Sequence, residues 1–587
     1  MLSKAIVAIA AAQAVAAYVT AQTPLSPLGS LADTQLHTSG PCKQFNILVP
    51  KQTGIANALE SLYNTPSFKT KTNDALSAII RVPSVSSENF LPVGQDPHWE
   101  TFSDLHTELR KLFPLVFKSL NVTTVNTYNL VFHWQGSDDS LKPVLLTAHQ
   151  DVVPVEPSTV DQWTHPPFSG YNDGVLVLCI PTQNISSLSI LAIGTWIWGR
   201  GSVDDKPDII SQLTAVDSLL KHGFKPKRSF VLAFGIDEES SGTYGARHIY
   251  KYLEGVFGQD SFAALIDEGS GFSEDSGIIF AGPAIDEKGY LDVRVEVRTP
   301  GGHSSVPPRH TAIGILAQAI TAIEANPHPT DLLRDSTTFQ YLQCAAEFSP
   351  SLNPLIRELT KRAEHDDNAL KELAHALVTQ PGEQGAFALA LLGTTQAVDL
   401  ISGGVKVNAL PEKVEAVVNH RISEYSSVSD LQSRFTSIVL PVAERFNLTL
   451  DAFGRVVFEG AEGRGEIVLS DAWGTALEPA PKTPTNEKTD GDVRPYELLQ
   501  GTIKAALKAS PAYKDKKVVS SPALALGNTD TKSYWNLTRH IFRYGHLPDD
   551  AMYNGAHTVN EAIHVNALVE KVRFHSKLIL NWSEADF

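Results

Sequence analysis

The stretch VLLTAHQD, residues 144–151, is an apolar run that ends in a histidine and, two residues later, an aspartate. Two more runs of this kind follow, SFVLAFGIDEE (229–239) and AALIDEG (263–269), and both end in acidic residues. Short continuous apolar runs are typical of strands buried in a parallel sheet, which delivers the residues after its strands into one cleft. The three runs therefore predict an α/β fold with a mostly parallel sheet and a polar site at its edge.

Helices are expected between these strands, and a second pattern appears further along the chain. DIISQLTAVDSLLKHG (208–223) carries apolar residues at helical spacing. GYLDVRVEVRTPGGHSS (289–305) instead alternates apolar and polar residues, like an antiparallel strand exposed on one face. We therefore predict a first domain interrupted by a smaller inserted α+β domain, at residues 46–287 with 456–587 and at residues 288–455 respectively.

The N-terminus predicts entry into the secretory pathway. Lys4 precedes an apolar run over residues 5–19, and the small residues before Gln22 suit a signal cleaved after residue 21. Residues 22–45 are expected to form a linker. The expected location is the vacuolar lumen or the extracellular space, with membrane attachment only if the signal is not cleaved. Five Asn-X-Ser/Thr sites are compatible with a glycoprotein: Asn121, Asn184, Asn447, Asn536 and Asn581.

Composition excludes several classes of protein. The chain has 587 residues, a net charge of -17 and a sequence pI near 5.6, so it lacks the basic surface that nucleic acid requires. Its three cysteines have no CxxC spacing, which excludes a disulfide framework and a zinc-thiolate site. Any metal must therefore be bound by histidine and carboxylate groups.

Five acidic or imidazole segments have the residue types that a two-metal site needs. A pair of zinc ions takes imidazole and carboxylate ligands with one bridging carboxylate, and a further group must move the proton of the bridging water. Each segment alone has an ordinary explanation, such as an acidic start of a helix. The five segments are HQD (149–151), GRGSVDDK (199–206), DEE (237–239), DEG (267–269) and GAHTVNE (555–561).

Two of these segments indicate which residues could bind metal and which could orient a ligand or transfer a proton. His149 ends a strand, and Asp151 is placed to accept its second ring N–H and fix the tautomer. Glu238 and Glu239 point in different directions as neighbours, so one can bind metal while the other acts as a general base. The absence of GxSxG and HExxH from the sequence argues against a serine hydrolase and a zincin. The sequence therefore favours a hydrolase with two metals.

Taken together, the motifs resemble those of the M20 metallopeptidase family and, within it, the fungal carboxypeptidase S or Gly-Xaa carboxypeptidase group. The resemblance covers nearly all of the chain after residue 45. It implies a zinc-dependent exopeptidase that releases the C-terminal amino acid from short peptides or N-acyl amino acids, with an inserted domain that serves as a lid and for homodimerisation. The motifs that carry it are WTHPPFSG (163–170), WGRGSVDDK (198–206), GGHSSVPP (301–308), GNTDT (527–531) and GAHTVNE (555–561).

The resemblance also implies a role for each matching residue. Two Zn²⁺ ions per chain are expected, one held by His149 and Asp267, the other by Glu239 and His557, with Asp204 bridging them. A hydroxide that bridges the two zinc ions would attack the peptide bond.

Other residues would assist that attack. Glu238 would be the general base, Asp151 would orient the first histidine ligand, and His303 would stabilise the oxyanion. The peptide bond between Asp204 and Asp205 is expected to be cis.

The residue that receives the free carboxylate of the substrate is left open among four candidates. Relatives commonly have arginine at the position of Lys532, which weakens bidentate capture there. The four candidates are Asn408, Arg421, Lys532 and Arg543.

One segment departs from the family pattern. Residues 175–194, VLVLCIPTQNISSLSILAIG, stand where relatives have a short connection, and we interpret them as a retained intron or an error in the gene model. Two other functions stay open: an amidohydrolase specialised for fatty-acyl amino acids, and an inactive family member that binds metal or peptide without turnover. The presence of Glu238 and all five expected ligands argues against the inactive member.

Overall fold

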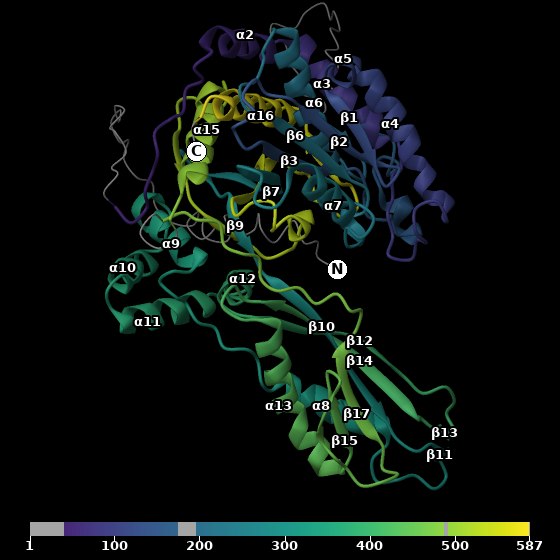
Figure 1. The fold of residues 1–587 in the computed structure, drawn as a ribbon. Coiled ribbons are helices and arrows are strands. Elements are labelled where there is room, and N and C mark those ends of the chain that lie inside the picture. Colours follow the sequence, from purple (N-terminus) through teal and green to yellow (C-terminus); the bar gives the residue numbers. More distant parts are fainter. Residues whose placement is uncertain (1–39, 174–194, 487–490, 586–587) are drawn as a thin grey trace, which may run out of the picture. The chain divides into compact units, whose positions relative to one another are not determined.

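The computed structural model describes residues 40–173, 195–486 and 491–585, which form two compact units (Figure 1). The first unit contains the described residues up to Ile285, residues 340–353 and the chain from Lys482 onward. The second contains residues 286–339 and 354–481. The expected signal, most of the expected linker and the unusual segment at 175–194 lie outside the described residues.

A ten-stranded sheet forms the centre of the first unit. Its main path runs β1-β2-β6-β3-β7-β20-β9-β19, and β8 pairs with both β7 and β18. The central pairs β6–β3, β3–β7 and β7–β20 are parallel, as the apolar runs predicted. The strands are β1 (Asn121–Val125), β2 (Asn129–Trp134), β3 (Val144–His149), β6 (Phe230–Gly235), β7 (Ala264–Asp275), β8 (Ile278–Ala281), β9 (Ala284–Glu287), β18 (Lys517–Ser520), β19 (Ala523–Ala525) and β20 (Ile541–Pro548).

Helices cover this sheet on both faces because its central strands are apolar on both sides. Val144 and Leu146 of β3 join the large core with helices α3, α6 and α16, whereas Leu145 packs with Ile249 of α7 on the other face. The helices of this unit are α2 (Thr53–Tyr63), α3 (Pro66–Ile80), α4 (Thr101–Leu112), α5 (Pro114–Ser119), α6 (Lys206–Lys221), α7 (Ala246–Phe257), α15 (Arg494–Ala509) and α16 (Ala567–Ser583).

Shorter elements connect the strands to the polar edge of the sheet. A three-stranded sheet, in the order β21-β5-β4, is formed by β4 (Tyr171–Asn172), β5 (Trp196–Trp198) and β21 (Ala562–His564). The single turns of 3-10 helix are η2 (Pro97–Glu100), η3 (Pro157–Gln162), η4 (Glu238–Ser240), η5 (Asp530–Ser533) and η6 (Asp549–Ala551).

The second unit is built on a six-stranded sheet in the order β12-β14-β10-β17-β15-β16. Strand β10 pairs antiparallel with β14 and β17, which agrees with the alternating pattern of the sequence. Helices α8 and α13 pack on its apolar face. The strands are β10 (Gly289–Arg298), β11 (Gly302–His303), β12 (Thr395–Gly403), β13 (Ala409–Leu410), β14 (Lys413–Ile422), β15 (Thr449–Ala452), β16 (Arg455–Phe458) and β17 (Glu466–Asp471). The helices are α8 (Ala312–Glu324), α10 (Pro354–Ala363), α11 (Asp367–Val378), α12 (Glu383–Leu392) and α13 (Val428–Phe446).

The inserted unit does not have the expected boundaries of 288 and 455. It continues to residue 481 because β17 pairs with both β10 and β15 and so completes the sheet before the chain leaves it. Residues 340–353, which include most of α9 (Thr337–Phe348), belong to the first unit. The residue pattern does not indicate this return to the first unit, since α9 is one of several helices in succession.

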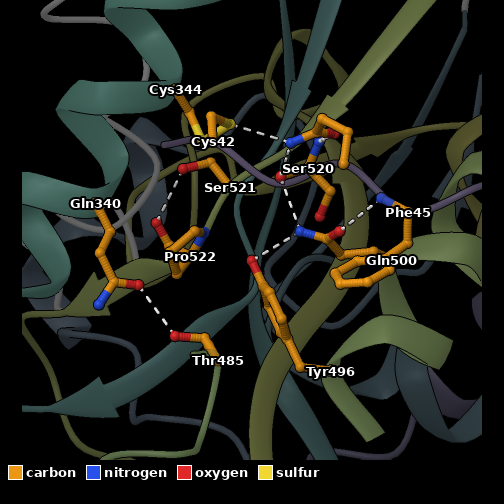
Figure 2. The surroundings of a disulfide bond; sticks show 11 residues. Cys42, Phe45, Gln340, Cys344, Thr485, Tyr496, Gln500, Ser520, Ser521 and Pro522 are labelled. Atoms are coloured by element: carbon orange, nitrogen blue, oxygen red, sulfur yellow. Dashed lines mark hydrogen bonds between the residues drawn. A yellow bond between two sulfur atoms is a disulfide. The ribbon is translucent and has the colours of Figure 1, made fainter. Parts of the chain in front are cut away.

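A disulfide joins Cys42 to Cys344 within the first unit (Figure 2). Next to it, the amide of Gln44 accepts a hydrogen bond from the backbone N–H of Ser520 and donates one to its carbonyl, at 3.0 and 2.8 Å. Gln500 donates to the same carbonyl at 3.0 Å. The sequence excluded a disulfide framework but did not anticipate this single bridge.

Four of the five predicted glycosylation sites lie among the described residues. Asn121, Asn447 and Asn536 are exposed, whereas Asn581 is buried and donates a hydrogen bond to the carbonyl of Leu48. Burial of that amide argues against glycan attachment at Asn581. Separately, no helix among the described residues has the length and apolar character needed to span a membrane.

Candidate metal centre and active site

The first candidate ligand lies at the end of a central strand. His149 is the last residue of β3 and is almost fully buried. Its Nδ1 lies 3.0 Å from the carbonyl and 3.3 Å from the Oδ1 carboxylate oxygen of Asp151, so this nitrogen carries the proton. The other ring nitrogen, Nε2, faces the carboxylate of Asp204 and is free to act as a ligand.

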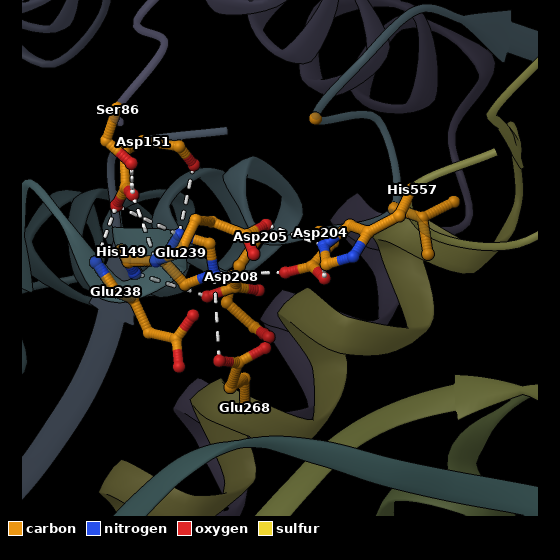
Figure 3. A network of polar contacts seen from close by, with 12 residues as sticks. Ser86, His149, Asp151, Asp204, Asp205, Asp208, Glu238, Glu239, Glu268 and His557 are labelled. Carbon is orange, nitrogen blue, oxygen red and sulfur yellow. Dashed lines mark hydrogen bonds and ion pairs between the residues drawn. The ribbon is translucent and has the colours of Figure 1, made fainter. Parts of the chain in front are cut away.

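The carboxylate of Asp204 lies between two imidazoles (Figure 3). Its Oδ1 is 3.0 Å from Nε2 of His149, and its Oδ2 is 3.1 Å from Nε2 of His557. The peptide bond to Asp205 is cis, as the family resemblance implied. His149 lies more than fifty residues before Asp204 in the sequence, and His557 lies more than three hundred residues after it. The fold thus brings three distant segments together at one carboxylate.

A glutamate accompanies each imidazole. Glu239, in η4 after β6, lies with Oε1 2.7 Å from Nε2 of His557. On the other side, Oε1 of Glu268 lies 3.6 Å from Nε2 of His149. Two groups of three side chains could hold a metal ion, because in each group one ligand atom from every residue lies within 4.8 Å of the other two. The groups are His149, Asp204 and Glu239, and His149, Asp205 and Glu268.

The structure places Glu268 in this cluster, where the sequence analysis expected Asp267. Strand β7 does not end at Asp267 but continues to residue 275, and Asp267 accepts a hydrogen bond from the Thr147 hydroxyl at 2.6 Å. The register with β20 is irregular just after Asp267, so that Glu268 and Gly269 are extra residues on β7. Such a bulge redirects a side chain, and here it turns Glu268 toward His149.

Asp151 connects the first histidine to the acidic turn after β6. Its two carboxylate oxygens accept hydrogen bonds from the backbone N–H groups of Glu238 and Glu239, both at 3.1 Å. The hydroxyl of Ser86 donates to it at 2.6 Å. Asp151 therefore lies where it could orient the histidine ring, and it also anchors the turn that carries the two glutamates. No motif of the sequence analysis included Ser86.

Glu238 lies beside the cluster without a direct contact to the histidines. Burial is the main reason that the pKa of its carboxyl is raised, and the nearby charges of His149 and Lys532 lower it in part. Figure 3 shows its side chain extending along His149 toward the side on which Glu268 lies. A carboxyl with a raised pKa next to candidate metal ligands is suited to proton transfer.

The charge balance of the cluster favours a cation. Burial and the charge of Asp204 raise the pKa of Glu239 to about 8. Burial opposes protonation of His557, but hydrogen bonds to Asp204 and Glu239 raise its pKa to about 11. The pKa of His149 is likewise raised against the effect of burial, mainly by Glu268. The carboxylates thus hold protons on the imidazoles, and divalent cations could replace those protons.

The candidates for substrate binding are divided between the two units. Lys532 lies in η5 of the first unit, close enough for its charge to affect Glu238. Arg543 is on β20, 1% exposed, and donates to the hydroxyl of Thr531 at 2.9 Å. In the second unit, His303 and Asn408 are exposed neighbours, since Ser304 donates to the carbonyl of Asn408. Arg421 of the same unit lies over the ring of Tyr290.

Comparisons with known proteins agree with this geometry. Residues 181–581 match the model of peptidase family M20/M25/M40. The chain belongs to this family. It is 35% identical to Carboxypeptidase S of Saccharomyces cerevisiae, over 93% of this chain and 91% of that protein. It is 30% identical to an N-fatty-acyl-amino acid synthase/hydrolase of Mus musculus, over 86% of this chain and 87% of that protein.

Solved structures of the family share the fold. The di-peptidase Dug1p of Saccharomyces cerevisiae superposes with a TM-score of 0.55 at 15% identity, covering 91% of this chain and 99% of that one. An M20 family metallo-carboxypeptidase of Sulfolobus solfataricus gives 0.54 at 16% identity, covering 87% and 99%. Family membership, together with the match to Carboxypeptidase S, makes this protein a metallocarboxypeptidase, a hydrolase of peptide bonds.

Proposed function

We propose that this metallocarboxypeptidase uses two zinc ions to release the C-terminal amino acid from short peptides of the Gly-Xaa type. The observation that carries the proposal is the position of Asp204, whose two carboxylate oxygens face two different imidazoles at 3.0 and 3.1 Å. A carboxylate shared in this way suits a bridge between two cations.

The donor set fits zinc. Imidazole nitrogens and carboxylate oxygens are its usual ligands where no thiolate is available. Several acidic side chains are buried together with only two imidazoles, an arrangement that is costly unless positive charge is added. One ion would be held by His149 and Glu268 and the other by His557 and Glu239, with Asp204 shared between them. Glu268 replaces Asp267 in this assignment.

The residues around the cluster define the chemistry. When bound, the two ions would lower the pKa of a water molecule and polarise the carbonyl of the scissile bond. Glu238 would accept the proton of the attacking water and pass it to the leaving amine, for which its raised pKa is suited. Asp151 would keep the His149 ring in the tautomer that leaves Nε2 available.

The new C-terminus of the substrate needs a cationic or amide partner. Among the four candidates, Lys532 has the strongest support because its charge acts on Glu238. The guanidinium of Arg543 is buried against Thr531, which is less suited to meeting a substrate directly. Asn408 and Arg421 remain candidates in the second unit. His303, on the same unit, remains the candidate for stabilising the oxyanion.

A second substrate class has its own support. The match to an N-fatty-acyl-amino acid synthase/hydrolase favours N-acyl amino acids as alternative substrates. These substrates share with Gly-Xaa peptides an amide bond next to a free carboxylate. The same groups could therefore act on both.

The compartment and the assembly state are part of the proposal. A disulfide between Cys42 and Cys344 suits an oxidising compartment, in line with an N-terminal signal and delivery to the vacuolar lumen or the cell exterior. A homodimer is proposed through the second unit, where β12 is an edge strand with Leu400 and Ile401 exposed. Gel filtration of wild type and Ile401→Lys would test it. A dimer that the substitution leaves intact would contradict this interface.

The experiment for the proposed activity measures hydrolysis of a blocked Gly-Leu dipeptide and of an N-acyl leucine by wild type and Glu238→Gln, each reconstituted with zinc. Loss of the general base should lower kcat about 10²- to 10⁴-fold, while zinc content stays at two ions per chain. Glu254→Gln, which makes the same change at a partly exposed residue of α7, is the matched control and should keep wild-type rates.

The outcomes separate the parts of the proposal. Undiminished turnover by Glu238→Gln would remove the base assignment. If the enzyme hydrolyses only the N-acyl leucine, the substrate class is N-acyl amino acids and not Gly-Xaa peptides. Absence of turnover on both substrates by a wild type that holds two zinc ions would support the inactive family member.

A further inference from the structure

Glu561, the last residue of the GAHTVNE motif, is completely buried beneath the turn that carries Asp204. Its Oε1 accepts hydrogen bonds from the backbone N–H groups of Gly201 and Val203 at 3.0 and 2.9 Å, and from that of Asp204 at 3.4 Å. Backbone N–H groups of one turn that converge on one point form a concave site for an anion. Here the carboxylate of the chain's own glutamate fills that site.

Arg200 balances the charge of this carboxylate. Its Nη1 donates to the second oxygen of Glu561 at 2.6 Å, and both side chains are buried. The guanidinium lies over the ring of Trp163, 5.4 Å from the ring centre. Residues of three separate motifs, WTHPPFSG, GRGSVDDK and GAHTVNE, therefore meet at one buried ion pair.

The backbone around this pair links the two segments that provide metal ligands. The carbonyl of Glu561 accepts a hydrogen bond from the N–H of Gly199 at 2.9 Å, and β21, which begins at the next residue, pairs with β5. His557 lies four residues before Glu561 on the same loop. The turn also tolerates no side chain at Gly201, where φ is +85° and an added Cβ would lie 2.6 Å from Val152. The turn thus lies between Glu561, which accepts hydrogen bonds from its N–H groups, and Val152, which lies against Gly201.

We infer that Glu561, paired with Arg200, is a positioning residue that sets the distance between the shared carboxylate of Asp204 and the imidazole of His557. This inference rests on the proposed function, because it assigns a role in the same metal centre. A buried ion pair that served only stability could lie anywhere in the core, whereas this carboxylate bonds to the N–H of Asp204 itself and of two residues just before it. Groups that orient metal ligands in this way typically change metal affinity 10- to 100-fold when they are removed.

The test compares two buried glutamates in the full-length protein. Glu561→Gln weakens the pair with Arg200 and the charge-assisted bonds to the turn. Glu570→Gln is the matched control, since Glu570 is also buried and forms a 2.6 Å ion pair, with Arg573 of helix α16, but is not bonded to the turn. Zinc affinity is measured by competition with a chromophoric chelator, and the absorption spectrum of the Co²⁺-substituted protein reports ligand geometry.

Glu561→Gln is expected to bind zinc about 10- to 100-fold more weakly and to show an altered Co²⁺ spectrum. Glu570→Gln should match wild type in both measurements even where its thermal stability is lower. If Glu561→Gln does not fold, Arg200→Met combined with Glu561→Gln removes both charges and leaves no unpaired ion in the core. The same loss of affinity is expected for the double variant.

Two results would overturn the inference. Wild-type zinc affinity and an unchanged Co²⁺ spectrum in the Glu561 variants would show that the pair serves stability alone. A wild-type protein that bound no Zn²⁺ or Co²⁺ would remove the metal centre itself and the positioning role with it. The wild-type titration therefore distinguishes failure of this inference from failure of the proposed function.

Discussion

The acidic residues of the two units have different partners. On the sheet of the second unit, Glu296 pairs with Arg298 and Lys413, and Glu466 pairs with Arg298. In the first unit, the acids at the end of the sheet face one another and two histidines, and among the described residues no lysine or arginine forms an ion pair with Asp204 or Glu239. Acids that are paired with arginine or lysine need no further positive charge, whereas buried acids without such partners indicate a cation site.

The largest effect is expected from Asp204→Asn. A neutral amide is a poor bridge between two cations, so we expect both ions to bind weakly and activity to fall more than about 10³-fold, as for other essential catalytic groups. Metal analysis and peptide hydrolysis measure this. Glu415→Gln, on the sheet of the second unit, is the control and should keep full activity. An Asp204→Asn protein with two zinc ions and normal turnover would contradict the claim that the buried acids of the first unit form a cation site.

Removal of metal should affect one unit and spare the other. A chelator would withdraw the ions proposed for the first unit, and loss of a ligand present at 100 times its Kd costs about 2.7 kcal/mol. Hydrogen exchange followed by mass spectrometry should show faster exchange in residues 199–206 and 555–561 and unchanged exchange in β10 and β14. Equal loss of protection in both units would contradict a metal centre confined to the first.

Neighbouring residues on β7 should respond differently to mutation. Glu268→Gln is expected to weaken metal binding about 10- to 100-fold, which corresponds to about 1.4–2.7 kcal/mol. Asp267→Asn should lower stability through Thr147 but leave metal affinity close to that of wild type. Calorimetric titration with zinc measures both. If Asp267→Asn weakened zinc binding more than Glu268→Gln, Asp267 and not Glu268 would be the ligand.

The smallest effect concerns an acid that is paired with arginine and lysine. Although burial acts in the opposite direction, Lys413 and Arg298 hold the pKa of Glu296 below its ordinary value. A carboxyl whose pKa is lowered in the folded state adds stability above its unfolded pKa and loses it as the pH falls. Because its partners Arg298 and Lys413 are half exposed, Glu296→Gln should destabilise the protein by about 1 kcal/mol at neutral pH, with the difference vanishing in acid. Denaturant unfolding at several pH values tests this, and a variant as stable as wild type at neutral pH would contradict it.

The fold class could be predicted from the sequence, and so could the segments that meet at the candidate site. Apolar runs predicted β3, β6 and β7, and alternation predicted the antiparallel pairing of β10, because both patterns depend on local residue order. The motifs contain His149, Asp204, Glu239 and His557, which the structure brings close together, but whether they bind metal stays a prediction. The sequence analysis proposed Asp267 beside them, whereas the structure brings Glu268 close to His149, because β7 continues past Asp267 through a bulge and register across strands is not a local property.

Other features depended on contacts between distant segments. The end of the inserted unit is set by the pairing of β17 with β10, well after the alternating pattern ceases to be informative. The disulfide of Cys42 had one available signal: without the segment at 175–194, which contains Cys179, a pair of cysteines remains in a chain that is expected to enter the secretory pathway. The contact of Ser86 with Asp151 involves a residue that no motif connects to the site, and although Glu561 ends the GAHTVNE motif, the motif does not show that it contacts the turn before Asp204.

The most direct test of the shared carboxylate is a crystal structure of the zinc-loaded protein with anomalous scattering at the zinc edge. We predict two peaks about 3.5–4 Å apart, both within bonding distance of Asp204, one next to His149 and Glu268 and the other next to His557 and Glu239. A single peak, or two peaks of which only one contacts Asp204, would contradict the account.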